Sequence, residues 1–382
     1  MRILMFLLVL ISACSDTANN YPGFGPVQVA GDLGSARTPV IFQTDDGTIQ
    51  FVWSEDRGDG PDLYIQEFSL AGKPLGDSRQ LTDSHNARRP QVTQTDSGLV
   101  IAWSDRLDGM LEVMAAGLDL TAGGLLDPTN VSQTPYYPSA SPRLTTYKGD
   151  ALLVWVDRRS FLFLTDSVML VTLDAQGNPI QEPVAISDLI TIVMQQPFEA
   201  RVAVSSKRIL IVGNDFNKNE WNVGLTDLTS LSDQPEYSRP FQSGSHHWAP
   251  AVGYFQSGYV IAFRDNGPVL PVIKTTWVDS QLSEFEDPVD IDTPSGFVHE
   301  PTVLAEGDLA TVVWREEDQD AVVLKVAQTG KSGPSRVPEI VIGDVGLGEP
   351  ATGLIMRQAY CLAYETLRAG HGAVFLFCGR RP

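Results

Sequence analysis

The chain contains 382 residues, of which 43% are apolar and 9% aromatic, so it has enough apolar side chains for a packed core and is not a disordered protein. Its formal net charge of −20 at pH 7 argues against nucleic acid as a partner, because nothing would neutralise the phosphates. The same charge argues against docking on an anionic lipid surface through a basic patch.

The first 14 residues are typical of an export signal. Met1-Arg2 form a short positive region, and residues 3–11 form an apolar run that is too short to span a bilayer. The run ends in Ile-Ser-Ala-Cys at 11–14, which resembles the lipobox of bacterial lipoproteins. The resemblance implies a signal peptide at 1–13 and lipid chains on Cys14, the first residue of the mature protein. A plain secretory signal with a chance cysteine is the alternative.

The residues after Cys14 bear on localisation. Ser15 rather than Asp follows the cysteine, which in the enteric-type sorting rule favours the outer membrane. Residues 14–23 are polar and turn-prone, so we expect a flexible tether there. No other run of about 20 apolar residues occurs. We therefore expect residues 24–382 to form a soluble body held at the cell envelope, on the periplasmic or the surface face of the outer membrane.

Two markers recur about every fifty residues and divide the chain into seven units. The first marker is an aromatic position, held by Trp53, Trp103, Trp155, Phe263, Trp314 and Tyr364, with Gly213 in the fourth unit. The second is a proline earlier in each unit, at Pro39, Pro90, Pro142, Pro250, Pro301 and Pro350, with Ala200 in the fourth unit. Because both markers keep the same register, the repeat is a property of the fold.

Each unit has the pattern of four short strands. In the second unit, residues 90–95 alternate, 99–104 are almost continuously apolar, 111–120 form a third segment and a weaker one lies near 126–132. Four strands in about 50 residues predict a β-propeller blade, since a β-sandwich module needs about twice that length. A proline at the head of each first strand fits, because that residue need not donate to the ladder.

The two ends of the repeat region complete each other. The last unit has only three strands, and residues 25–32 form a strand without a unit. We therefore predict an all-β fold, a single seven-bladed β-propeller of four-stranded antiparallel blades, with the ring closed by the N-terminal strand in the last blade. The blades begin near 39, 90, 142, 200, 250, 301 and 350, and six or eight blades are the alternatives. Closure removes open strand edges that would invite aggregation.

The segments Trp-Ser-Glu-Asp-Arg-Gly-Asp-Gly at 53–60 and Trp-Ser-Asp-Arg-Leu-Asp-Gly at 103–109 resemble TolB-type and WD40-like bacterial propeller repeats. The resemblance implies this architecture and export, and it carries no catalytic residue across. The Ser-x-Asp-x-Gly-x-x-Trp box of sialidases does not occur.

An acidic residue follows the aromatic marker by two positions in six units: Glu55, Asp105, Asp157, Asp215, Asp265 and Glu316. A feature repeated in nearly every blade is best explained by blade construction, with the carboxylate accepting hydrogen bonds within the turn. A ring of carboxylates that binds Ca²⁺ is the alternative. We expect no other cofactor and no metal site.

The non-repeating residues are more informative about function. All five histidines are predicted in loops on the top face of the ring, where ligands of propellers usually bind, and aromatic residues accompany them. Our candidate ligand-binding residues are His85, Arg89, Tyr137, His247, Trp248 and His299. They are compatible with a metal site, a sugar platform or a protein-contact patch. Alternatively, polar loops simply collect such residues.

Cys361 and Cys378 flank a predicted hairpin turn, in a compartment where disulfides persist. They would face each other across the hairpin, so we predict a disulfide between them. Two buried free thiols, or a metal-binding pair, are the alternatives.

No catalytic residue is predicted, because the chain has neither a Gly-x-Ser-x-Gly elbow nor a phosphate-cradling loop. Our leading hypothesis is a lipid-anchored, non-enzymatic propeller that binds an envelope protein or a glycan through its top face. The alternative is a carbohydrate-active enzyme, a glycoside hydrolase or a polysaccharide lyase, with acidic and His residues at the channel mouth. A structural member of an envelope complex is a third option.

The lipid anchor is directly testable. Cells that express the protein with labelled palmitate should incorporate the label, and Cys14→Ser should abolish incorporation because the acceptor sulfur is gone. The variant should leave the membrane fraction, whereas Ser15→Ala should stay there. Label that survives Cys14→Ser would contradict the prediction.

Overall fold

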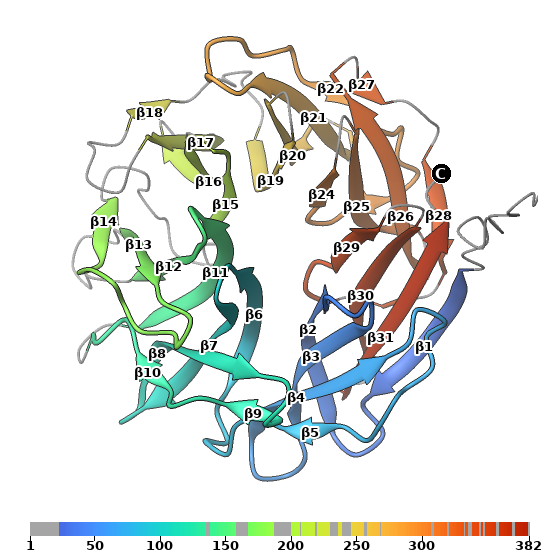
Figure 1. Ribbon diagram of the computed structural model, residues 1–382. Coiled ribbons are helices and arrows are strands. Elements are labelled where there is room, and N and C mark those ends of the chain that lie inside the picture. Colours follow the sequence, from blue (N-terminus) through green and yellow to red (C-terminus); the bar gives the residue numbers. More distant parts are fainter. Residues whose placement is uncertain are drawn as a thin grey trace, which may run out of the picture.

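A computed structural model describes residues 23–134, 138–157, 167–186, 200–206, 208–217, 220–229, 236–238, 246–255, 258–267, 269–306, 309–318, 321–331, 333–334, 338–343, 345–346, 348–356, 359–368 and 371–380. Seven β-sheets stand side by side around a central axis (Figure 1). The predicted seven-bladed propeller is therefore confirmed. The predicted signal peptide, Cys14 and the tether up to residue 22 lie outside the described residues. Within the described ranges, no helix is long and apolar enough to cross a membrane.

The blades follow one another in chain order, and the first four are made of the following strands. Blade 1 contains β2 (Ser35–Gln43), β3 (Ile49–Asp56), β4 (Pro61–Phe68) and β5 (Arg79–Gln80). Blade 2 contains β6 (Arg88–Thr95), β7 (Gly98–Leu107), β8 (Met110–Asp119), β9 (Gly124–Leu125) and β10 (Thr129–Asn130). Blade 3 contains β11 (Ser139–Tyr147), β12 (Asp150–Asp157), β13 (Ser167–Leu173) and β14 (Val184–Ile186). Blade 4 contains β15 (Arg201–Val204), β16 (Ile209–Asn217), β17 (Glu220–Leu228) and β18 (Glu236–Ser238).

The remaining three blades complete the ring. Blade 5 contains β19 (His246–Phe255), β20 (Gly258–Asn266), β21 (Pro271–Asp279) and β22 (Val289–Asp290). Blade 6 contains β23 (Phe297–Val298), β24 (Thr302–Glu306), β25 (Leu309–Asp318), β26 (Ala321–Gly330), β27 (Gly333–Pro334) and β28 (Glu339–Ile342). Blade 7 contains β29 (Thr352–Met356), β30 (Ala359–Arg368), β31 (His371–Arg380) and the N-terminal β1 (Phe24–Ala30).

The second and third strands of each blade form its longest uninterrupted antiparallel pairing, and their sequences explain why. In blade 2, β7 and β8 pair without interruption from Leu99 opposite Leu118 to Leu107 opposite Met110. Most residues of both strands are buried because each face of the sheet packs against a neighbouring blade. Such strands appear in sequence as nearly continuous apolar runs.

The repeated proline differs from our expectation. Pro39, Pro90, Pro142 and Pro250 lie inside the first strands, each within a break in the pairing register, rather than at the strand heads. The residue before each proline has a positive φ, for example 49° at Thr38. A β-bulge interrupts the ladder, so the missing proline N–H costs no hydrogen bond there. In blades 6 and 7, β24 and β29 begin only after the proline.

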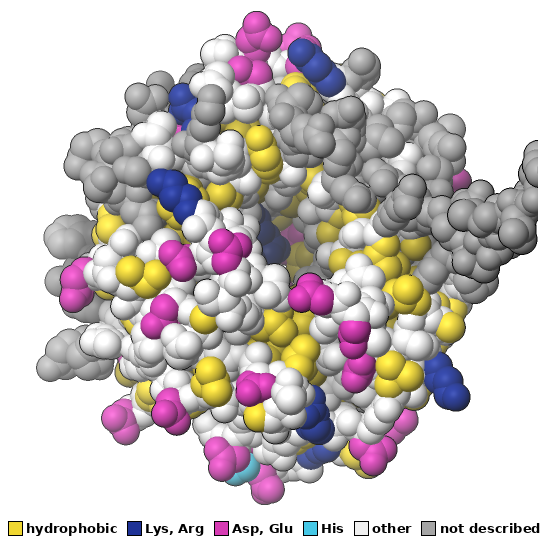
Figure 2. All heavy atoms as spheres, in the orientation of Figure 1, with side chains coloured by type: hydrophobic (Ala, Val, Ile, Leu, Met, Phe, Trp, Pro, Cys, Tyr) yellow, Lys and Arg dark blue, Asp and Glu magenta, His cyan; other side chains and the backbone are white. Residues whose placement is uncertain are grey.

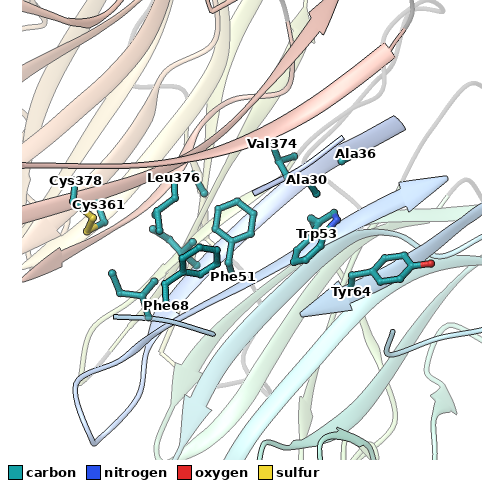
Figure 3. Close-up of a cluster of buried hydrophobic side chains, with 13 residues drawn as sticks. Ala30, Ala36, Phe51, Trp53, Tyr64, Phe68, Cys361, Val374, Leu376 and Cys378 are labelled. Atoms are coloured by element: carbon teal, nitrogen blue, oxygen red, sulfur yellow. A yellow bond between two sulfur atoms is a disulfide. The ribbon is translucent and has the colours of Figure 1, made fainter. Parts of the chain in front are cut away.

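The predicted ring closure is confirmed, and a cluster of buried apolar side chains supports it between blades 7 and 1. β1 pairs antiparallel with β31, as shown by Gln28 opposite Phe375. Behind this pairing, Phe51, Trp53 and Phe68 pack against residues of blade 7 (Figure 3). The rings of Phe51 and Trp53 meet edge to face at 5.8 Å between centroids, a contact worth about 0.5–1.5 kcal/mol beyond the buried area.

The acidic position after the aromatic marker has a structural role in blades 1 and 2. Trp53 Nε1 donates to Glu55 Oε2 at 3.3 Å, and Trp103 Nε1 donates to Asp105 Oδ2 at 3.0 Å. Residues two apart on a strand share one face, so the spacing lets the carboxylate satisfy the buried indole N–H. Glu55 also receives Arg57 at 2.7 Å.

The predicted disulfide is confirmed. Cys361 and Cys378 are directly opposite on β30 and β31 and are bonded, with their Cα atoms 4.1 Å apart. Both are buried, and the bond lies in the cluster that joins blades 7 and 1 (Figure 3).

Removing this bond should weaken the closing blade. We expect the double variant Cys361→Ala, Cys378→Ala to lose about 2–4 kcal/mol of unfolding free energy, because the unfolded chain regains entropy. Guanidinium unfolding of the two proteins under non-reducing conditions measures the difference. With reductant present throughout unfolding, the wild type should approach the variant, and unchanged midpoints under both conditions would contradict the prediction.

Candidate functional site at the channel mouth

A cavity of about 970 Å³ opens on the axis of the ring, at the face where second strands turn into third strands. Its walls come from blades 1, 2, 5, 6 and 7. Figure 2 shows one face of the ring hollowed at its centre, with charged side chains of both signs inside the hollow. A volume of this size is typical of a small-molecule or cofactor site.

The two residues before the repeated proline supply much of the cavity wall. In blades 1, 2, 6 and 7 these pairs all line the cavity: Arg37-Thr38, Arg88-Arg89, His299-Glu300 and Gly348-Glu349. In the first two pairs, the second residue is the bulge residue with positive φ. The fold therefore presents chemically different side chains from equivalent backbone positions.

The charge at the mouth differs from that of the whole chain. The chain has 27 Lys and Arg residues against 47 Asp and Glu residues. Among the described residues of the cavity wall, the basic ones are Arg37, Arg88, Arg89, Arg264 and Arg315, and the acidic ones are Asp56, Glu300, Glu349 and Glu365. The mouth is thus slightly basic on a strongly acidic protein.

A recurring contact holds the mouth together. The residue after the aromatic marker bonds to the backbone just before the proline of the next blade, and we call this contact the inter-blade clasp. Its members are Ser54 Oγ to Ala87 O at 2.9 Å, Ala249 N to Asn214 Oδ1 at 2.8 Å, Arg315 Nη1 to Gly348 O at 2.5 Å and Thr38 N to Glu365 Oε2 at 2.6 Å. Each clasp holds the backbone that precedes the proline, and in blades 1, 2 and 7 this backbone carries residues of the cavity wall.

Glu365 and Arg315 form the most buried part of this system. Glu365 also accepts from Glu349 N at 2.9 Å, so one carboxylate holds both the bulge before Pro39 in blade 1 and the segment before Pro350 in blade 7. Arg315 donates to Glu365 O at 2.7 Å, and its burial lowers its pKa while Glu365 and Glu349 oppose that shift. Burial also raises the pKa of Tyr364, the neighbouring aromatic marker. The contacts of Glu365 and Arg315 hold the rim of the cavity in place.

Arg89 links blade 2 to blades 3 and 7 in the wall of the cavity. Its guanidinium donates to Glu349 Oε1 of blade 7 at 2.6 Å and to Ser141 Oγ of blade 3 at 2.8 Å. A second cavity of about 330 Å³ lies along the first strands and shares Thr38, Arg89 and Glu349 with the mouth. The Arg89–Glu349 pair therefore lines both cavities.

His299 is the titratable ring of the mouth. Its Nε2 lies 3.5 Å from Glu317 Oε2, and its ring meets Phe297 edge to face at 5.3 Å. Burial lowers the pKa of His299; Glu317 opposes this shift, and Arg264 and Arg315 add to it. The imidazole is therefore neutral at neutral pH, with a lone pair that can accept a proton.

The structure separates the residues that the sequence singled out. Arg89 and His299 lie at the mouth, whereas His85 binds Asp62 through Nδ1 at 3.0 Å and does not line the cavity. His247 lies within β19, not in a loop, and is buried with its ring 4.9 Å from that of Phe263. Tyr137 and the side chain of Trp248 lie outside the described residues.

Sequence reasoning missed several residues of the cavity wall. Three of them stand one or two residues before the repeated proline: Arg37, Glu300 and Glu349. Two others directly follow the aromatic marker: Arg264 and Arg315. The register itself was the signal, because these positions are equivalent from blade to blade. The described part of the chain holds no group of three or more His, Cys, Asp or Glu residues that could bind a metal ion.

Comparison with known proteins identifies the fold. No protein-family model matches the chain, and no curated protein matches it. A polysaccharide lyase of family PL25, an ulvan lyase solved with -[GlcA(1-4)Rha3S]-, is 11% identical with a TM-score of 0.57, over 93% of this chain and 95% of the lyase. The GH93 α-L-arabinofuranosidase of Fusarium graminearum, solved with arabinobiose, is 13% identical with a TM-score of 0.53, over 81% of this chain and 98% of that enzyme.

A third similar structure is the sialidase of Trypanosoma rangeli in complex with 2,3-difluorosialic acid. It is 9% identical with a TM-score of 0.51, over 92% of this chain and 58% of the sialidase. At such low identities these likenesses show the propeller fold alone. The chain is thus structurally similar to carbohydrate-active propellers, and the TolB-type resemblance stays a prediction.

The clasp at Glu365 should be important for stability. In Glu365→Ala, two amide N–H groups lose their acceptor, at a cost of about 1–3 kcal/mol each, so we expect a loss of about 2–6 kcal/mol of unfolding free energy. Urea unfolding measures this loss. The exposed Glu182→Ala is the matched control, and equal effects of the two substitutions would contradict the role of the clasp.

Proposed function

We propose that the protein is a carbohydrate-active enzyme that cleaves a glycosidic bond at the channel mouth. The observation that carries the proposal is His299, which is held neutral by its surroundings in the wall of a cavity of about 970 Å³. Titratable groups with a shifted pKa in a cleft are characteristic of catalytic sites.

The neutral imidazole of His299 is suited to accept a proton. The proton comes from a water molecule if the bond is hydrolysed, or from a sugar-ring carbon if the bond is broken by elimination. In both cases negative charge develops next to the base. Arg264 and Arg315 contribute a fixed positive potential at this place, which stabilises such charge.

Phe297 gives the site a surface for a sugar ring. It lines the cavity with 43% of its surface exposed, and the guanidinium of Arg264 lies 5.2 Å from its ring centroid. An aromatic ring that is partly exposed in a polar cavity offers an apolar face to the C–H groups of a sugar, while nearby polar groups bind its hydroxyls.

The comparisons support this proposal over our leading hypothesis from the sequence, a non-enzymatic binding propeller. The ulvan lyase and the arabinofuranosidase act on glycans and share the propeller fold with this chain. An anchor at Cys14 in the outer membrane, which we retain as part of the proposal, would place the cavity where extracellular or envelope polysaccharides are met.

Incubation with a panel of neutral and acidic polysaccharides tests the activity. New reducing ends indicate cleavage, and ultraviolet absorbance from an unsaturated sugar distinguishes elimination from hydrolysis. We expect His299→Gln to reduce kcat/KM by about 10²–10⁴-fold, the usual contribution of a general base. Because the pKa of His299 is lowered from 6.5, the acid limb of the pH profile should lie below pH 6.5.

His371→Gln is the matched control, since His371 is exposed and lies outside the cavity wall. It should keep full activity. Saturable glycan binding without any cleavage would contradict enzymatic activity and favour the binding function instead.

A further inference from the structure

We propose that Arg37 and Arg88 bind two acidic groups of the substrate, so that the substrate is an anionic glycan carrying carboxylates or sulfates. The inference rests on the proposed function in placing a glycan at the channel mouth, and it adds the chemical class of that glycan. It depends on two side chains that the proton-transfer site around His299 does not use.

Arg37 and Arg88 occupy equivalent positions in adjacent blades. Each stands two residues before the repeated proline and is paired across the strands with a serine, Ser54 for Arg37 and Ser104 for Arg88. Each also follows a fully buried alanine, so strand alternation turns both arginines away from the packed interior. Both arginines therefore line the same cavity, from neighbouring walls.

These two arginines differ from the other three of the cavity wall. Arg89 is bound to Glu349, Arg315 is bound to backbone carbonyls, and Glu300 opposes the burial-driven fall in the pKa of Arg264. By contrast, Arg37 and Arg88 are exposed, and their side chains make no hydrogen bond or ion pair with any described residue. Both side chains are therefore available to a ligand in the cavity.

Guanidinium groups that line a cavity select oxyanions. Arginine presents a planar fork of N–H donors that matches a carboxylate or sulfate, and such charge-assisted bonds are about twice as strong as neutral ones. A neutral sugar offers no partner of this kind. Two arginines from adjacent blades thus favour a chain with more than one acidic group.

The charge of the rest of the protein confines such a ligand to the mouth. With a net charge of −20, most of the surface repels a polyanion. The slightly basic cavity wall is then the place where a polyanion is attracted, and the attraction is screened by salt. Salt sensitivity is therefore a signature of binding through Arg37 and Arg88.

Calorimetric titration with defined probes tests the inference. The probes are oligosaccharides of polygalacturonate (carboxylate), of carrageenan (sulfate) and of arabinan (neutral), added to the His299→Gln protein so that no cleavage interferes. We expect an acidic probe to bind and arabinan not to bind. Arg37→Gln and Arg88→Gln, each added to that background, should weaken binding by about tenfold and reduce its salt dependence.

Two further variants complete the design. Arg79→Gln is the matched control, an exposed arginine on the outermost strand of blade 1, and should bind like the parent protein. Arg88→Lys keeps the charge without the fork and should restore part of the affinity. The preferred acidic probe shows whether the group recognised is a carboxylate or a sulfate.

Three results would overturn the inference: arabinan binding as tightly as the acidic probes, no acidic probe binding, or Arg37→Gln and Arg88→Gln behaving like Arg79→Gln. Failure of the proposed function looks different. Acidic binding that depends on both arginines, with no cleavage of any glycan by the wild type, would keep this inference and remove the enzyme. Cleavage of arabinan without acidic binding would do the reverse.

Discussion

The inter-blade clasp is the contact on which the functional surface depends. Each blade alone is a small twisted sheet, and apolar packing between blades sets their spacing only along the faces. At the axis, buried side-chain and backbone polar groups need partners, and Glu365 and Arg315 provide them across the blade boundaries. The same contacts hold the backbone before the prolines in place. The shape of the mouth therefore follows from the need of buried polar groups for hydrogen-bond partners.

A backbone position that recurs from blade to blade, but carries different side chains, explains how one ring acquires a specific site. In blades 1, 2 and 3 the bulge before the proline has a similar positive φ whether it carries Thr38, Arg89 or Ser141. Blades 1 and 2 place arginines before this proline. Blade 6 places His299 and Glu300 there, in a segment that precedes its strand β24. The axis of a propeller brings these differences within reach of one ligand, although the residues are far apart in the sequence.

The sequence was sufficient for features that repeat or that lie close in the chain. The markers at Trp53 and Pro39 predicted seven blades and the closure, and two cysteines flanking one turn predicted their bond. The wall of the mouth is a different case, since Glu349 meets Arg89 only after the ring has closed. His247 was predicted in a loop, because it is a polar residue beside aromatic ones. The strand β19 begins before the predicted start of blade 5 and buries His247. The proline was misplaced for a related reason, because a bulge lets a strand start before it.

The N-terminal strand also constrains the order in which the molecule can fold. β1 leaves the ribosome first among the strands, yet its partner β31 spans His371–Arg380 and is made after all the other blades. Blades 1 to 6 consist of consecutive segments and can form during synthesis, whereas blade 7 needs the longest loop closure in the chain. Until then β1 and the open side of blade 1 expose the apolar surface that includes Phe51 and Trp53. Closure of the ring is thus the last step, and the period before it is when the chain is most exposed to aggregation.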